Sequence, residues 1–193
     1  MGMRFEPTGI EGLLLIHVER HGDDRGSFGR TFCREEFQAR GLPGEFIQAS
    51  SSRTWRAGTV RGMHLQRPPH MEAKLIRCVR GTIHDVICDL RPHSTTCLCQ
   101  RAFRLHQDDD CLLFVPTGCA HGFQTLTDDV EVLYSMSHTF APEAATGLRH
   151  DDPALAITWP APVTCIADKD LRWPAYDSAN FSNCQPPPCQ RAG

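Results

Sequence analysis

The middle of the chain is a series of short segments in which apolar and polar residues alternate. Residues 59–66, 73–80 and 82–91 follow this pattern and are rich in β-branched side chains. Alternation with a period of two predicts strands that bury one face. Further segments of this kind occur at residues 12–18, 27–32, 46–50, 99–105, 110–115, 121–126 and 131–138. Many short strands, separated by glycine, proline, aspartate or serine, predict an all-β sandwich or barrel.

Two stretches depart from the strand pattern. Residues 33–40 have the charges and spacing of a short helix, which Gly41 and Pro43 end. After Tyr176 the chain has few apolar side chains and contains three consecutive prolines, which predicts an irregular tail over residues 177–193. We therefore predict one domain over residues 1–176, followed by a tail to which no function is assigned.

Composition and charge limit the partners of this domain. The net charge is −3, and lysine and arginine are scattered, so no basic face indicates a nucleic-acid partner. The apolar run at residues 13–18 is too short for a signal peptide or a membrane span. We expect a cytoplasmic protein that binds neither nucleic acid nor membrane.

The ten cysteines do not have the spacing of a zinc site. Cys97 and Cys99 are separated by one residue, and no C-x-x-C pair occurs, so structural zinc is disfavoured. Cys78, Cys88 and Cys111 lie inside apolar segments, where a free thiol behaves as a small buried hydrophobe.

Candidate chemistry is concentrated at residues 59–80. His64 ends one predicted strand and Lys74 begins the next, and two antiparallel strands place both side chains in one cavity. A histidine can accept a proton near neutral pH, and an ammonium group can stabilise negative charge on an oxygen. This pair suits removal of a proton from a carbon next to a carbonyl.

A second pattern is the turn at residues 116–122, which places His121 on a strand that faces the interior. Such a Pro-x-Gly-x-x-His turn is typical of the cupin jelly roll. Cupins that bind a metal usually carry two histidines one residue apart and a glutamate, whereas this chain has His64-Leu65-Gln66. A cupin without a metal is favoured, although His70, Glu72 and His121 remain possible ligands.

Longer motifs extend this resemblance to one family. From about residue 5 to residue 176 the chain resembles the dTDP-4-dehydrorhamnose 3,5-epimerase family of sugar-nucleotide epimerases. The matching segments are DDRGSFGRTF (23–32), VRGMHLQRPP (60–69), AKLIRCVRGTIHDVICDLR (73–91), VPTGCAHGF (115–123), VLYS (132–135) and DDPALAITWP (151–160). The resemblance implies a cupin-type jelly roll with a few short helices, no cofactor and no metal. It also implies a homodimer in which each subunit lends residues to its neighbour's site.

The same resemblance implies roles for four catalytic residues. His64 corresponds to the base, Tyr134 to the acid on the other face of the sugar, and Lys74 to a cation near the enolate oxygen. Asp170, which aligns better than Asp168, corresponds to the carboxylate that holds the histidine. The reaction is the inversion of carbon 3, carbon 5 or both in a nucleoside-diphosphate 4-keto-6-deoxy sugar. Such reactions supply surface polysaccharides or glycosylated natural products.

The binding residues implied by the resemblance include several departures from the family pattern. The matching contacts are Arg25 and Arg61 for the diphosphate, His121 for the substrate, Gln48 for the nucleotide, and Phe140 in place of a tyrosine that stacks on the base. Arg30 replaces a glutamate, Ser50 an asparagine, and Ala145 another polar contact. A guanidinium group cannot accept the hydrogen bond that a carboxylate accepts, so the base and the sugar stay open.

Two other classes of function remain open at this point. One is a metal-dependent cupin enzyme that uses His70, Glu72 and His121. The other is a sugar-nucleotide-binding protein without activity, which would require a broken catalytic set. His64, Lys74, Tyr134 and Asp170 are all present, which favours the enzyme.

Overall fold

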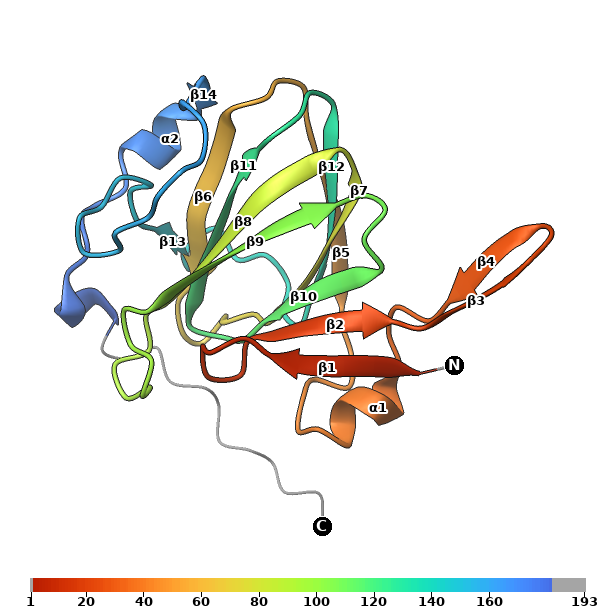
Figure 1. The fold of residues 1–193 in the computed structure, drawn as a ribbon. Helices are drawn as coiled ribbons and strands as arrows, with labels where there is room; N and C mark the ends of the chain where they lie inside the picture. Colours follow the sequence, from red (N-terminus) through yellow and green to blue (C-terminus); the bar gives the residue numbers. More distant parts are fainter. Residues whose placement is uncertain (1, 182–193) are drawn as a thin grey trace, which may run out of the picture.

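Two sheets packed face to face form the body of the protein in the computed structural model, which describes residues 2–181 (Figure 1). The first sheet has the strand order β1-β2-β10-β7-β12-β5, and the second has the order β13-β6-β11-β8-β9, with β14 beside β6. The strands of the first sheet are β1 (Met3–Pro7), β2 (Leu14–Val18), β10 (Cys111–Val115), β7 (Lys74–Arg80), β12 (Val130–Met136) and β5 (Gln48–Thr54). Those of the second are β13 (Ala145–Gly147), β6 (Thr59–Gln66), β11 (Cys119–Thr125), β8 (Thr82–Asp89), β9 (Gln100–His106) and β14 (Cys165–Ile166). The predicted all-β, cupin-type architecture is confirmed.

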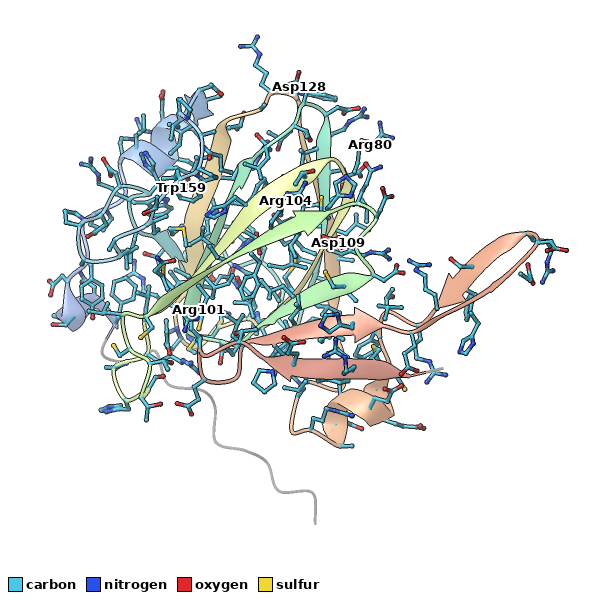
Figure 2. The ribbon with its side chains drawn as sticks, viewed as in Figure 1. Arg80, Arg101, Arg104, Asp109, Asp128 and Trp159 are labelled. Carbon is cyan, nitrogen blue, oxygen red and sulfur yellow. The ribbon has the colours of Figure 1, made fainter. Side chains whose placement is uncertain are left out.

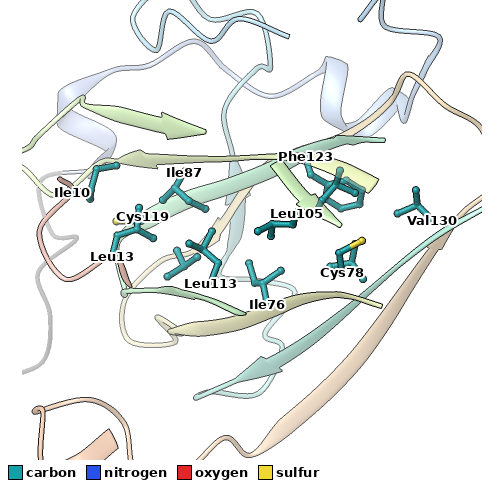
Figure 3. Close-up of a cluster of buried hydrophobic side chains, with 13 residues drawn as sticks. Ile10, Leu13, Ile76, Cys78, Ile87, Leu105, Leu113, Cys119, Phe123 and Val130 are labelled. Carbon is teal, nitrogen blue, oxygen red and sulfur yellow. The ribbon is translucent and has the colours of Figure 1, made fainter. Parts of the chain in front are cut away.

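The main core fills the space between the two sheets (Figure 3). Alternate residues of the central strands point into it, among them Ile76 and Cys78 of β7, Ile83 and Ile87 of β8, and Phe123 of β11. Because strand side chains alternate between faces, the intervening residues point outward. Burial raises the pKa of the Cys78 thiol to about 11 and that of Cys88 to about 12, so both behave as small apolar groups.

A second cluster covers the outer face of the second sheet beneath the C-terminal segment. It includes Met63 and Leu65 of β6, Val86 of β8, Leu155 and Phe181. β6 and β8 are therefore covered on both faces, which explains why almost all of their residues are buried or partly buried. This covering segment leads the chain back to the edge of β6, where β14 pairs with β6 in parallel.

The amide of Gln124 anchors this segment. Its Nε2 donates to the Ala161 carbonyl at 2.8 Å, and its Oε1 accepts from the Ala161 amide at 3.1 Å. The short helix α2 (Asp168–Leu171) follows β14. A buried glutamine on β11 thus helps to place α2 beside β6.

The predicted helix at residues 33–40 is confirmed as α1 (Arg34–Gln38). Its one buried side chain, Phe37, packs edge-on against the aromatic rings of Phe5, Phe32, Phe46 and Phe114. Aromatic side chains bury large apolar areas, so this cluster fixes α1 against the outer face of the first sheet.

Several element boundaries differ from the sequence prediction. Residues 20–29 form a hairpin, β3 (Arg20–Asp23) and β4 (Gly26–Gly29), where a polar turn at 21–25 and a strand at 27–32 were expected. β5 begins at Gln48 and ends at Thr54, later than the expected 46–50, because this edge strand consists mostly of serine and other polar residues. β1, β13 and β14 were not predicted, since they are short or lack a clear alternation.

β6 and β7, which carry His64 and Lys74, do not pair with each other. β6 pairs with β11 and β13, and β7 pairs with β10 and β12. The two strands belong to opposite sheets, and the two side chains meet because the inner faces of these sheets oppose each other.

The end of the described chain is a 3₁₀ turn, η1 (Ser178–Phe181), whose Phe181 ring stacks on Tyr176. The boundary of the domain after residue 176 stays a prediction, and residues 182–193 of the predicted tail lie outside the described residues. Within residues 2–181, no helix is long and apolar enough to cross a membrane.

Candidate active site

A cavity of about 610 Å³ opens between the inner faces of the two sheets. Its walls combine β6 and β11 of the second sheet with β5, β7 and β12 of the first, and the segment from β14 to α2 closes one side. Of the predicted site residues, it brings together His64, Lys74, Tyr134, Asp170, Gln48, Ser50, Arg61, His121 and Phe140.

His64 and Asp170 form a hydrogen-bonded pair at this cavity. The distance from His64 Nε2 to Asp170 Oδ1 is 2.7 Å, and the Asp170 side chain is only 2% exposed. Because a carboxylate only accepts hydrogen bonds, Nε2 carries the hydrogen and Nδ1 is free to accept a proton. Burial raises the pKa of Asp170, but hydrogen bonds from His64, Gly62 and Trp173 outweigh it and hold that pKa below its usual value. Asp170 is therefore a carboxylate that can stabilise a protonated His64.

Tyr134 lines the same cavity from β12, on the wall opposite β6. Burial raises the pKa of its phenol far above the usual value, and the negative charge of Asp85 adds to this effect. The phenol therefore keeps its hydrogen at neutral pH and can donate it. The cavity thus has a proton acceptor on one wall and a proton donor on the other.

His121 of β11 contacts a carboxylate that sequence reasoning missed. Its Nε2 donates to Asp85 Oδ1 at 2.7 Å, and Asp85 is fully buried. The His121 ring is 5.9 Å from the Tyr134 ring, edge to face. Asp85 lies two residues from Ile83 and from Ile87 on the same strand, so all three side chains point into the core. A carboxylate at such a position indicates a buried hydrogen-bond partner.

Lys74 is held between two oxygen atoms. Its Nζ is 3.2 Å from Glu72 Oε1 and donates to the His64 carbonyl at 3.3 Å. Burial raises the pKa of Glu72, although the charge of Lys74 opposes that rise. The ammonium group is therefore fixed at the cavity wall close to the base, which suits stabilisation of an oxyanion.

The three residues left open as metal ligands do not converge. His70 lies 3.7 Å from Glu143, Glu72 pairs with Lys74, and His121 bonds to Asp85. Among residues 2–181, no group of three histidine, cysteine, aspartate or glutamate side chains is arranged to hold a metal ion.

Cations and an aromatic ring lie at other points of the cavity wall. Arg61 is anchored by a 2.9 Å bond from its Nε to Thr54 Oγ1. Lys169 also lines the cavity and was missed, although its place directly before Asp170 on α2 could have indicated it. Gln48 Oε1 accepts from the Phe140 amide at 2.9 Å, and Phe140 is 63% exposed, which leaves its ring available for stacking.

Arg25 and Arg30 do not reach the cavity of their own chain. Arg25 lies at the tip of the β3–β4 hairpin, which projects from the body (Figure 1), and its side chain is 90% exposed and paired with Asp23. Arg30 bonds to Glu36 of α1 at 3.1 Å. Ala145 lies on β13, opposite Gln66 of β6.

Comparison with known proteins agrees with this geometry. The model of the family described as dTDP-4-dehydrorhamnose 3,5-epimerase matches residues 7–178. The chain belongs to this family. A dTDP-4-dehydrorhamnose 3,5-epimerase of Methanothermobacter thermautotrophicus is 38% identical over 88% of this chain and 92% of its own length. A dTDP-4-dehydrorhamnose 3-epimerase of Streptomyces niveus is 36% identical over 87% of this chain and 81% of its own length.

A solved structure supports the same assignment. The dTDP-4-dehydrorhamnose 3,5-epimerase of Bacillus anthracis, determined with TDP and pyrophosphate bound, is 34% identical. It has a TM-score of 0.87 over 91% of this chain and all of its own. The predicted family and the prediction of an isomerase that epimerises sugar nucleotides are confirmed.

Proposed function

We propose that this epimerase inverts carbon 3, carbon 5 or both of a dTDP-linked 4-keto-6-deoxy sugar. The observation that carries the proposal is the placement of the His64–Asp170 pair and Tyr134 on opposite walls of one cavity. A ketone at carbon 4 acidifies the hydrogens on both neighbouring carbons, so a base on one side and an acid on the other invert a centre. The intact pair disfavours a binding protein without activity.

The reaction begins when the neutral imidazole of His64 takes the proton from carbon 3 or carbon 5. Asp170 stabilises the imidazolium that forms, in the way a carboxylate stabilises the histidine of a catalytic triad. The electron pair of the broken C–H bond moves into the ring and becomes an enolate, with its charge on the oxygen of carbon 4. Lys74 stabilises this charge, since a fixed cation in a partly buried site is more effective than water.

The reaction ends when Tyr134 returns a proton to the carbon from the opposite face. The phenol is suited to this step because its raised pKa keeps the hydrogen in place until the enolate forms. His121 contacts the substrate from β11, close to Tyr134, and its hydrogen bond to Asp85 fixes the orientation of its ring. No oxidation or reduction occurs, because one proton leaves the carbon and another replaces it.

The nucleotide is held by the remaining residues of the cavity. Arg61 and Lys169 are the cations available to the diphosphate, and the guanidinium group suits paired hydrogen bonds to phosphate oxygens. Gln48 and Ser50 contact the nucleotide, and Phe140 stacks on the base. The related structure from Bacillus anthracis was determined with TDP and pyrophosphate bound, which supports a dTDP-linked substrate.

Arg25 and Arg30 act in a homodimer in this proposal. The β3–β4 hairpin carries Arg25 and an exposed Phe28, which is 66% accessible, away from its own subunit. A projecting hairpin of this kind fits a dimer in which it reaches the site of the second subunit, where Arg25 adds a charge for the diphosphate. The partner then covers sheet edges that are exposed in one subunit.

Proton NMR in heavy water tests the proposed reaction. With dTDP-4-keto-6-deoxyglucose, catalytic enzyme should remove the hydrogen signals of carbon 3, carbon 5 or both, and His64→Ala should slow this exchange by about 100-fold or more. Exchange at one carbon identifies a mono-epimerase. If neither signal is lost, and 4-keto sugars on other nucleotides show no exchange either, the proposed reaction is wrong.

A further inference from the structure

The side chain of Trp173 contacts the His64–Asp170 pair. Its Nε1 donates to Asp170 Oδ1 at 3.2 Å, and this is the oxygen that binds His64 Nε2 at 2.7 Å. The other carboxylate oxygen of Asp170 accepts from the Gly62 amide at 3.4 Å. The indole ring lies edge-on to the imidazole, with centroids 6.4 Å apart. Trp173 is not among the residues that line the cavity, so it touches the pair without facing the substrate.

The backbone beside His64 is shaped to admit this indole. Gly147 of β13 is the direct pairing partner of His64 on β6. A Cβ atom at Gly147 would lie 2.7 Å from the Trp173 ring and 2.5 Å from the Met63 carbonyl, and both distances are shorter than real contacts. A residue without a side chain at this position therefore allows Trp173 to approach Asp170.

We propose that Trp173 is a positioning residue that completes a hydrogen-bonded triad with Asp170 and His64. The indole N–H fixes the orientation of the Asp170 carboxylate and withdraws charge from the oxygen that faces the base. This inference rests on the proposed function, in which His64 takes a proton from the sugar. It adds a residue outside the cavity that sets how strongly the base binds its proton.

The effect of the indole N–H on the base follows from the chemistry of a shared acceptor. Two donors on one carboxylate oxygen divide its negative charge, so each receives a weaker hydrogen bond. Without the Trp173 donor, the whole charge of Oδ1 acts on His64 and favours the imidazolium form. A protonated imidazole cannot take a proton from carbon. When the pH is lowered, a variant without the Trp173 donor should therefore lose activity at a higher pH than the wild type.

Several titratable groups line the cavity together with His64. They are Arg61 on β6, Glu72 just before β7, Lys74 at its start, His121 on β11, Tyr134 on β12, His138 after β12, Cys165 on β14, and Lys169 and Asp170 on α2. Trp173 donates its hydrogen bond to Asp170, and Trp173→Phe changes the charge of none of these groups. A shift in the pH profile therefore reports the loss of the indole hydrogen bond.

The test replaces the indole by a ring without a donor. Trp173→Phe should move the acidic limb of the kcat/KM profile upward by about half to one pH unit. It should lower kcat about three- to tenfold, with little change in KM, because the carboxylate loses its fixed orientation. Trp173→His, which keeps a ring N–H, should restore part of the shift.

Trp159→Phe is the matched control. Trp159 also donates its Nε1 hydrogen, to the His150 carbonyl at 2.9 Å, but it belongs to the segment over the outer face of the second sheet (Figure 2). Its replacement removes the same kind of bond and should leave the pH profile unchanged. An equal shift in both variants, or none in Trp173→Phe, would overturn the inference.

An NMR titration of the His64 ring without substrate separates this inference from the proposed reaction. The titration midpoint of the His64 ring should rise in Trp173→Phe and not in Trp159→Phe. If it rises and the protein shows no hydrogen exchange on any keto sugar, the proposed reaction fails and the triad stands. If exchange is normal and the midpoint does not move, only the triad is wrong.

Discussion

Asp85 binds His121 through a 2.7 Å hydrogen bond, and both side chains are buried beside Tyr134. The second oxygen of Asp85 is also buried, and no donor among residues 2–181 reaches it. A buried carboxylate in this position acts on two neighbours at once. It fixes the imidazole of His121, and its charge contributes to the raised pKa of Tyr134.

Asp85→Asn should lower kcat about tenfold, because His121 loses the carboxylate that holds its ring. Burial is the larger cause of the raised pKa of Tyr134, so the phenol should stay protonated without the Asp85 charge. The fall in kcat should therefore be the same at every pH at which the protein stays folded, as steady-state kinetics can measure. An unchanged kcat would show that the Asp85–His121 bond does not support the reaction.

Lys74→Met should separate the catalytic and structural effects of the Lys74–Glu72 pair. Loss of the ammonium group should lower kcat about 100-fold, because the enolate oxygen loses its nearest cation. It should also leave Glu72 buried without its counter-ion, which raises the pKa of that carboxyl further above its ordinary value of 4.5.

The structural effect has a definite sign. A carboxyl whose pKa is higher in the folded state binds more protons there than in the unfolded state. The free energy of unfolding therefore falls as the pH rises above the pKa of that carboxyl in the unfolded chain. Urea unfolding at pH 5 and pH 8 should show a larger fall in Lys74→Met than in the wild type. Equal falls in the two proteins would mean that Lys74 does not stabilise the ionised Glu72.

Mixing two inactive variants tests the proposed exchange of the β3–β4 hairpin between subunits. In a mixed dimer of Arg25→Ala and His64→Ala, one site keeps both His64 and the Arg25 of the other subunit. Random mixing makes half of the dimers mixed, so activity should return to about a quarter of the wild-type value. Each variant mixed with itself is the control. No recovery, with mixed dimers verified by mass spectrometry, would place Arg25 outside the neighbouring site.

The sequence supported the fold and much of the site because their signals are local. The alternation in β6, β7 and β8 indicated strands, because successive side chains of a strand point to opposite faces of its sheet. The turn before β11 indicated that His121 faces inward. β1, β13 and β14 were missed because their own residues show no strand pattern. They are strands because they pair with β2 or β6.

The rest of the site depends on contacts between distant parts of the chain. Asp170 reaches His64 across 106 positions of sequence, and only the family resemblance indicated that pair. Trp173 carries no local pattern that separates it from an ordinary packing residue. The positions of Asp85 and Lys169 in the sequence are suggestive, but they do not identify the partners of these side chains. Arg25 matched a family contact and Arg30 replaced one, but the distance of Arg25 from the cavity of its own chain depends on where the hairpin projects.

The central claim is that His64 removes a proton from one face of the sugar and Tyr134 returns one to the other. Tyr134→Phe in heavy water tests it most directly, with dTDP-4-keto-6-deoxyglucose followed by proton NMR. His64 should still exchange hydrogen for deuterium on its own face, while formation of the inverted sugar falls about 100-fold or more. Inversion at the wild-type rate in Tyr134→Phe, or exchange that persists in His64→Ala, would contradict the account.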